Sequence, residues 1–107
     1  MLRQITPRQL ADLLAAPDQA PQMLDVREPW EYRICHIDGA ELLPMRQVPG
    51  SLDRIARDRP VVIICHHGIR SQQVALYLLN QGVKDVLNLN GGVARWAQDV
   101  DPTMPTY

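Results

Sequence analysis

The sequence predicts a single α/β domain built on a parallel sheet. Short apolar segments alternate with segments of helical periodicity, which is typical of parallel strands joined by helices. The segment 61–64 has four β-branched residues and no polar alternation, as expected of a central strand covered on both faces. A chain of 107 residues suits one compact domain and is too short for two.

The first elements can be read in chain order. Thr6-Pro7-Arg8-Gln9 has the pattern of a capping box with proline at the first helical position, and Pro17 ends that helix. The segments that follow are expected as a strand over 22–26, a brief helix over 28–33, an edge strand over 40–43 and, after the turn at Pro49-Gly50, a second amphipathic helix with Leu52, Ile55 and Ala56.

The same alternation continues beyond the central strand. A helix follows whose apolar side is formed by Val74, Ala75, Leu78 and Leu79, with Gly82 as its cap. A strand over 86–89, a turn at Gly91-Gly92 and a short helix over 93–97 come next. From about residue 98 the chain is a proline-rich C-terminal tail, which we expect to be extended.

Composition excludes several classes of function. Eleven basic and twelve acidic residues leave a net charge of -1, with no basic stripe for nucleic acid. No stretch approaches the ~18 apolar residues of a membrane span, and the first residues lack a signal-peptide core. Cys35 and Cys65 do not form a metal-ligand pattern. We therefore expect no metal or other cofactor, and two free thiols in a reducing cytoplasm.

Cys65 is the strongest candidate for chemistry, because it leaves the central strand at the carboxyl edge where reactive sites of such sheets lie. A tight loop to the next helix would aim successive backbone N–H groups inward, and Gly68 supplies the backbone freedom. These amides, the helix N-terminus and Arg70 would favour the nucleophilic thiolate. The alternative is a small buried core cysteine, which is common at the end of an apolar strand.

Three segments resemble signatures of the rhodanese domains. They are 24–32 (LDVREPWEY) with 36–40 (HIDGA) close behind, the loop Cys65-x-x-Gly68-x-Arg70-Ser71, and 89–93 (LNGGV) with Trp96. They occur in the family's order and cover roughly residues 3–97. The resemblance implies one rhodanese-like domain over residues 1–107, with a five-stranded parallel sheet flanked by helices on both faces.

The resemblance also implies an enzyme of the thiosulfate sulfurtransferase type that works by double displacement. Cys65 would take sulfane sulfur from thiosulfate or a persulfide donor and pass it to cyanide or a thiol. The anionic donor would be bound by the loop residues His66, His67, Gly68, Ile69, Arg70 and Ser71. The alternative is a relay that delivers sulfur to an accepting protein with little thiosulfate turnover.

The length of the loop bears on whether it can bind a sulfur atom or a phosphoryl group. Four residues separate Cys65 from Arg70. Related phosphatases of this fold have a loop one residue longer, which accommodates a tetrahedral phosphate. The shorter ring of amides favours a terminal sulfur over a phosphoryl group, so phosphatase or arsenate reductase activity is disfavoured.

Several loop residues have more than one open role. His66 and His67 either attract an anionic donor as the pH falls towards ~6.5, or line the mouth without a role. We expect Arg70 both to bind the anion and to brace the loop by pairing with an acid such as Asp25. Ser71 either donates its hydroxyl to the sulfur or caps the helix.

Two features away from the loop are expected to be structural. Asp25, Arg27 and Glu31 are interpreted as an internal ion-pair set at a strand end rather than a substrate site. Cys35 replaces the glycine of the family pattern, and is either a second sulfur acceptor or an ordinary buried cysteine. A right-handed crossover carries the chain away before it returns, so we expect Cys35 to be remote from Cys65.

Overall fold

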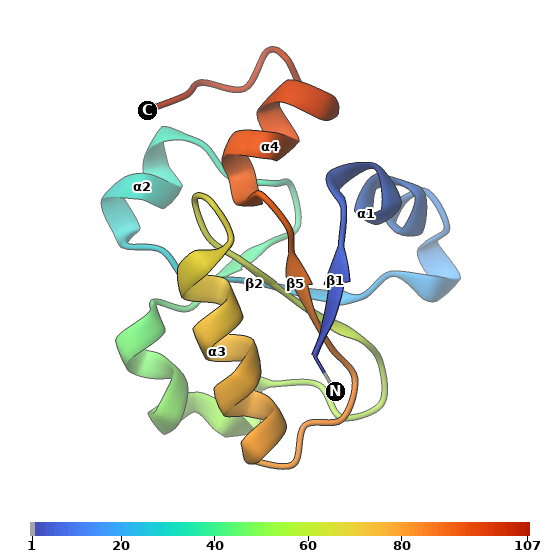
Figure 1. The fold of residues 1–107 in the computed structure, drawn as a ribbon, viewed down its shortest axis with the longest axis vertical. Helices are drawn as coiled ribbons and strands as arrows, with labels where there is room; N and C mark the ends of the chain where they lie inside the picture. The colour runs from blue at the N-terminus through green and yellow to red at the C-terminus, as the bar shows by residue number, and fades with distance from the viewer. Residues whose placement is uncertain (1) are drawn as a thin grey trace.

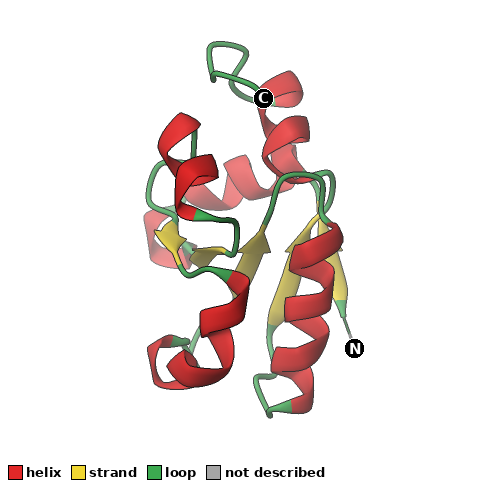
Figure 2. Ribbon diagram, turned by 90° about the vertical axis from the view of Figure 1, so that its left-hand side faces the viewer, coloured by secondary structure: helices red, strands yellow, loops and turns green. Residues whose placement is uncertain are grey.

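The computed structural model describes residues 2–107 as a parallel sheet with helices on both faces (Figure 1, Figure 2). The strands are β1 (Arg3–Ile5), β2 (Gln22–Asp25), β3 (Glu41–Leu42), β4 (Val61–Ile64) and β5 (Val86–Leu89). They pair in the order β1-β5-β4-β2-β3, and every pair is parallel. The predicted α/β class, the five parallel strands and the central place of β4 are therefore confirmed.

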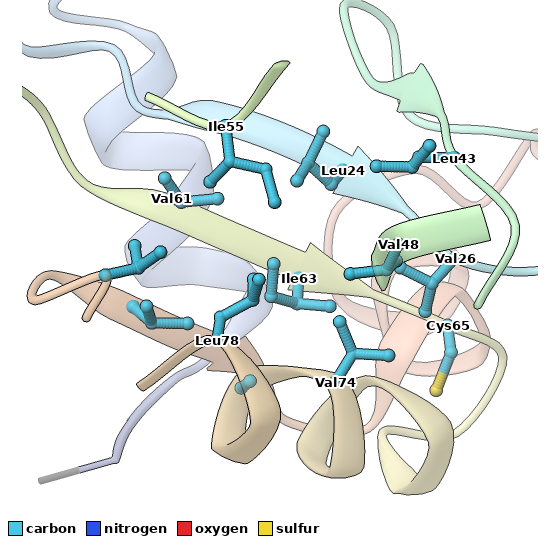
Figure 3. Packing of buried hydrophobic residues seen from close by; sticks show 13 residues of the cluster. Leu24, Val26, Leu43, Val48, Ile55, Val61, Ile63, Cys65, Val74 and Leu78 are labelled. Carbon is cyan, nitrogen blue, oxygen red and sulfur yellow. The ribbon is translucent and has the colours of Figure 1, made fainter. Parts of the chain in front are cut away.

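Two apolar clusters cover the two faces of the sheet. On one face, α3 (Ile69–Asn80) and the 3-10 segment η2 (Met45–Arg54) pack over alternate residues of β4 such as Ile63 (Figure 3). On the other face, α1 (Pro7–Leu14) and α4 (Gly92–Asp99) pack over the intervening residues such as Ile64. Because β4 is covered on both faces, all four of its residues are buried.

The remaining elements are short. The predicted capping box of α1 is present: the Gln9 amide donates to the Thr6 hydroxyl, and the Thr6 amide donates to the Gln9 side chain. The 3-10 turn η1 (Pro17–Gln19) follows α1, and α2 (Pro29–Ile34) follows β2. Within residues 2–107, no helix combines the length and the apolar character that crossing a membrane requires.

The strand β1 is absent from the residue-by-residue prediction, which contains four strands. It has three residues, and Ile5 alone of them is buried, so it shows neither a long apolar run nor a clear alternation. Its pairing with β5 places Arg3 opposite Leu87, far along the chain. Strand formation here depends on that distant partner rather than on a local pattern.

The second amphipathic helix expected after Pro49-Gly50 is wrong in type and extent. The structure has the 3-10 segment η2 instead, which begins at Met45, is interrupted at Ser51 and ends at Arg54. The Gln22 side-chain amide donates to the Arg54 carbonyl, and its oxygen accepts from the Ala56 N–H. These bonds divert the groups that an α-helix would use, so the residues that follow η2 leave the helical path.

The C-terminal tail does not run out extended as predicted. α4 extends to Asp99, and the chain then turns so that the Met104 N–H donates to the Asp101 carbonyl. The ring of Tyr107 stacks on His66 in the loop that follows β4. The tail therefore contributes to the candidate site.

Candidate active site at the Cys65 loop

The loop between β4 and α3 brings the backbone tightly around the Cys65 side chain. Gly68 is the N-cap of α3 and has a positive φ of 99°, a conformation that residues with a side chain rarely adopt. A Cβ atom at Gly68 would also lie 3.2 Å from the Gly91 nitrogen and 3.3 Å from the Leu89 carbonyl oxygen. Both the backbone conformation and the available space therefore require glycine here.

The first turn of α4 holds the outer side of this loop. The Val93 N–H donates to the Cys65 carbonyl at 2.9 Å, and the Ala94 N–H donates to the His66 carbonyl at 3.1 Å. A Cβ atom at Gly92 would lie 2.3 Å from the Cys65 carbonyl oxygen, so the approach is possible only with glycine. The glycine pair 91–92, which belongs to the third signature of the resemblance, thus fixes the loop in place.

The Cys65 sulfur is buried and lies within a small polar cradle. It points from the end of β4 towards the first turn of α3 (Figure 3). The Gly68 N–H donates to Sγ at 3.0 Å, and the Ser71 hydroxyl lies 3.2 Å from Sγ. Gly68 occupies the N-cap of α3 and no side chain caps this helix, so Ser71 does not take the capping role.

Asn88 is a residue of this cradle that sequence reasoning missed. It is buried in β5, and its side-chain oxygen accepts from the Ser71 hydroxyl. Its amide nitrogen donates to the Gly68 carbonyl at 3.2 Å and to Gln4 Oε1 at 2.9 Å. The available signal was a polar residue within a strand that is otherwise apolar and buried on both faces.

Arg70 has a different partner from the one expected. Its guanidinium makes two hydrogen bonds with the Glu31 carboxylate, at 2.7 and 2.9 Å, whereas Asp25 is engaged by Arg27. The hydrogen bond from Arg70 lowers the pKa of Glu31 to about 2, although burial opposes this shift. The same bond raises the pKa of Arg70. The prediction failed because α2, rather than the end of β2, faces the Arg70 side chain.

Of the predicted ion-pair set at the end of β2, Arg27 and Asp25 form a fully buried pair, whereas Glu31 pairs with Arg70 instead. Arg27 Nη2 lies 2.7 Å from Asp25 Oδ2, and it also donates to the Cys35 carbonyl. Burial alone would lower the pKa of Arg27, but the hydrogen bonds and charge of Asp25 outweigh burial and raise it. Arg27 therefore stays charged, and its pairing with Asp25 organises the chain around it.

Three rings stack at the mouth of the loop. His66 lies between His67 and Tyr107, with ring centroids 4.1 Å from each. The Tyr107 hydroxyl accepts from Arg27 at 2.7 Å and donates to Glu31 at 2.8 Å. Burial, followed by the proximity of His67, lowers the pKa of His66, and burial raises the pKa of Tyr107 to about 12. No local pattern marks Tyr107, since its position depends on the path of the whole tail.

A cavity of about 260 Å³ opens beside these rings. Its lining includes Cys35, both loop histidines and Tyr107. Cys35 was expected to be remote from Cys65; it shares this cavity with His66 and His67, while Cys65 itself is not part of the lining. Ile69, by contrast, points its side chain into solvent, so its contribution to the loop comes from the backbone.

Comparisons with known proteins agree with this geometry. A family model described as the rhodanese-like domain matches residues 6–99. The chain is 40% identical over 75 residues to the thiosulfate sulfurtransferase GlpE of Shewanella oneidensis, and the match covers 70% of this chain and 74% of that protein. The crystal structure of a rhodanese-like domain protein from Staphylococcus aureus matches with a TM-score of 0.82 at 32% identity, covering 88% of this chain and 90% of that one.

A further relative is much longer. The chain is 36% identical over 105 residues to the probable adenylyltransferase/sulfurtransferase MoeZ of Mycobacterium tuberculosis. The match covers 96% of this chain but 26% of MoeZ, so the chain spans about a quarter of that relative's length.

Proposed function

Because the chain belongs to the rhodanese-like domain family, we propose that it is a sulfurtransferase that carries sulfane sulfur on Cys65 as a persulfide. The contacts of Cys65 Sγ with the Gly68 N–H and the Ser71 hydroxyl are the main support. Hydrogen-bond donors at this distance stabilise a sulfur anion, which is the nucleophilic form of cysteine. Both cysteines are free in the structure, and a reducing cytoplasm would keep them so.

The proposed reaction is a double displacement with thiosulfate as donor, since GlpE is named for that substrate. The Cys65 thiolate attacks the outer sulfur of thiosulfate and forms a new S–S bond. The S–S bond of thiosulfate breaks, and sulfite leaves with its electron pair. A thiolate or cyanide then attacks the outer sulfur of the persulfide, which transfers that sulfur and returns Cys65 as the thiolate.

One observation favours a second candidate, a relay that takes sulfur from a protein persulfide. The loop's cation Arg70 is already paired with Glu31, and burial lowers the pKa of His66. Positive charge available to a dianionic donor at the mouth is therefore reduced. A persulfide donor carries less negative charge than thiosulfate and depends less on such a cation.

Intact mass spectrometry after treatment with thiosulfate tests the carrier directly. One sulfur atom, about 32 mass units, should be added to the chain and should be removed by cyanide. Cys65→Ser should never form the adduct, whereas Cys35→Ala should form it normally. An adduct that persists in Cys65→Ser would contradict the assignment of Cys65.

The donor is tested by comparing the loading rate with thiosulfate and with cysteine persulfide at equal concentration. The enzyme proposal predicts loading by thiosulfate and steady production of thiocyanate in the presence of cyanide. The relay predicts rapid loading by the persulfide and little thiocyanate from thiosulfate. Loading by neither donor, in a folded protein, would contradict both.

A further inference from the structure

Asn88 connects the two groups that touch the Cys65 sulfur. Its side-chain oxygen accepts from the Ser71 hydroxyl, which lies 3.2 Å from Sγ. Its amide nitrogen donates to the carbonyl of Gly68, whose own N–H donates to the same sulfur. A polar side chain in a central parallel strand is costly to bury unless every polar atom has a partner, and Asn88 has them.

The orientation of the Asn88 amide is fixed by its neighbours. The Gly68 carbonyl can only accept a hydrogen bond, so the NH₂ group of Asn88 must face it. The oxygen of the amide then faces Ser71, and it can only accept. The hydroxyl of Ser71 consequently has two competing acceptors, the Asn88 oxygen and the sulfur.

The Ser71 hydroxyl has one proton, and the charge of the sulfur decides where it is best placed. When Cys65 is a neutral thiol, its S–H donates to Ser71 Oγ, and the hydroxyl proton goes to Asn88. When the sulfur is an anion, it accepts rather than donates, and a hydrogen bond to a charged acceptor is the stronger one. The hydroxyl must then rotate towards the sulfur and leave the Asn88 oxygen.

We infer that Asn88 is a positioning residue that competes with the Cys65 sulfur for the Ser71 hydroxyl proton and thereby opposes ionisation of the thiol. In the thiol, the Asn88–Ser71 bond is made; in the thiolate and the persulfide anion, it is exchanged for a Ser71–sulfur bond. Ionisation breaks the S–H bond and releases that proton to solvent, while the hydroxyl only rotates about its Cβ–Oγ bond. The inference rests on the proposed function solely for the choice of Cys65 as carrier.

Other charged groups surround the loop, and none is altered by a change at residue 88. Arg70 comes from α3 and its partner Glu31 from α2, while the Asp25–Arg27 pair lies at the end of β2. The remaining titratable groups near the loop are His66, His67, the thiol of Cys35 and the phenol of Tyr107. A shift produced at Asn88 alone is therefore measured against a constant background of charge.

The test is the pH midpoint for alkylation of Cys65 by iodoacetamide, measured in the Cys35→Ala background so that one thiol remains. Asn88→Leu replaces the amide with a hydrocarbon of similar shape and frees the Ser71 hydroxyl for the sulfur. The midpoint should fall by about 0.5 to 1 pH unit, which corresponds to one neutral hydrogen bond. If Asn88 only braces the loop, the Gly68 contact loosens and the midpoint rises instead, which overturns the inference.

A double-mutant cycle with Ser71→Ala separates a role through Ser71 from a general effect. Ser71→Ala alone should raise the midpoint, because the anion loses its hydroxyl donor. In the Ser71→Ala background, Asn88→Leu should no longer lower the midpoint. An unchanged midpoint in Ser71→Ala, or a fall that persists in the double variant, overturns the inference.

Two further variants control for folding and for the other contact of Asn88. Asn88→Val suits a central strand and should lower the midpoint as Asn88→Leu does; a rise would count against the inference. Gln4→Ala removes the other acceptor of the Asn88 amide and should leave the midpoint unchanged. Alkylation needs no sulfur donor, so a failure of the proposed sulfur transfer would appear separately in the mass measurement.

Discussion

The two sides of the Cys65 loop are built from different interactions. On the side of β2 and α2, the contacts are ionic: Arg27 pairs with Asp25, and Glu31 pairs with Arg70, whose side chain comes from α3. On the side of α3 and β5, the contacts are hydrogen bonds among neutral groups, which connect Ser71 and Asn88 with the sulfur. The charges are thus tied to one another, while the neutral groups contact the reactive atom.

This difference suits two separate tasks. A buried ion pair has one favourable arrangement, because each charge is very costly without its partner, so the ionic side holds the loop's surroundings in place. A neutral hydroxyl can act as donor or acceptor, so the neutral side can serve both the thiol and the anion. The comparison predicts that changes on the ionic side act mainly on stability, and changes on the neutral side mainly on the sulfur.

The largest expected effect is the loss of unfolding free energy caused by Arg27→Met. The change leaves Asp25 as a buried charge without its partner, and this costs about 3–5 kcal/mol of unfolding free energy. Urea denaturation measures it. Arg46→Ala is the matched control, because it breaks an exposed pair with Glu28 and should change the unfolding free energy far less. Equal losses of unfolding free energy in the two variants would show that the buried pair contributes no more to stability than the exposed one.

Glu31→Gln should change how stability depends on pH. The pKa of Glu31 is lowered in the folded state to about 2 from an ordinary value of 4.5, so its ionised form stabilises the fold above that ordinary value. This contribution, on the order of 3 kcal/mol, is lost as the pH falls through the window between the two values.

Unfolding free energies of the wild type and of Glu31→Gln, measured against pH, check this sign. The difference between the two proteins should be greatest near neutral pH and should shrink as Glu31 is protonated. Parallel curves across the acidic range would show that Glu31 contributes no charge-dependent stability.

Arg70→Ala should be the exception on the ionic side, with a smaller effect that falls on the reaction. Arg70 is the charged residue of the ionic side whose positive charge acts on Cys65, but Glu31 partly neutralises it. Sulfur loading from thiosulfate should slow by about tenfold, near 1.4 kcal/mol in activation free energy. Arg70→Lys should restore part of the rate, because it keeps the charge but loses the paired geometry. Loading within twofold of the wild type would limit Arg70 to bracing the loop.

The smallest effect is expected for His66→Ala. Burial and the proximity of His67 lower the pKa of His66, so this imidazole offers a donor less positive charge near neutral pH than an ordinary histidine would. Loading rates of the wild type and the variant should agree within about twofold above neutral pH. An alkaline limb near pH ~6.5 that disappears in His66→Ala would instead support the donor-attracting role considered from the sequence.

The central strand and the position of Cys65 could be predicted because their signals are local. Four consecutive apolar β-branched residues followed by a tight glycine loop need no knowledge of distant segments. Strand β1 and the pairing of Arg70 with Glu31 could not be predicted this way. Each depends on which distant element packs against the residue in the fold: β5 in the first case and α2 in the second. Tyr107 was missed for the same reason: the path of the tail carries it to the loop.

The cradle of Cys65 also has an order of assembly. Asn88 and the α4 amides that hold the loop carbonyls lie more than twenty residues after Cys65 in the chain, and β5 in turn pairs with β1. During synthesis Cys65 therefore emerges from the ribosome before Asn88 and the α4 amides do. Contacts of such long sequence separation form late and slowly in folding. A released chain truncated before α4 would lack the amides that hold the loop, so the reactivity of Cys65 would report whether the domain has been completed.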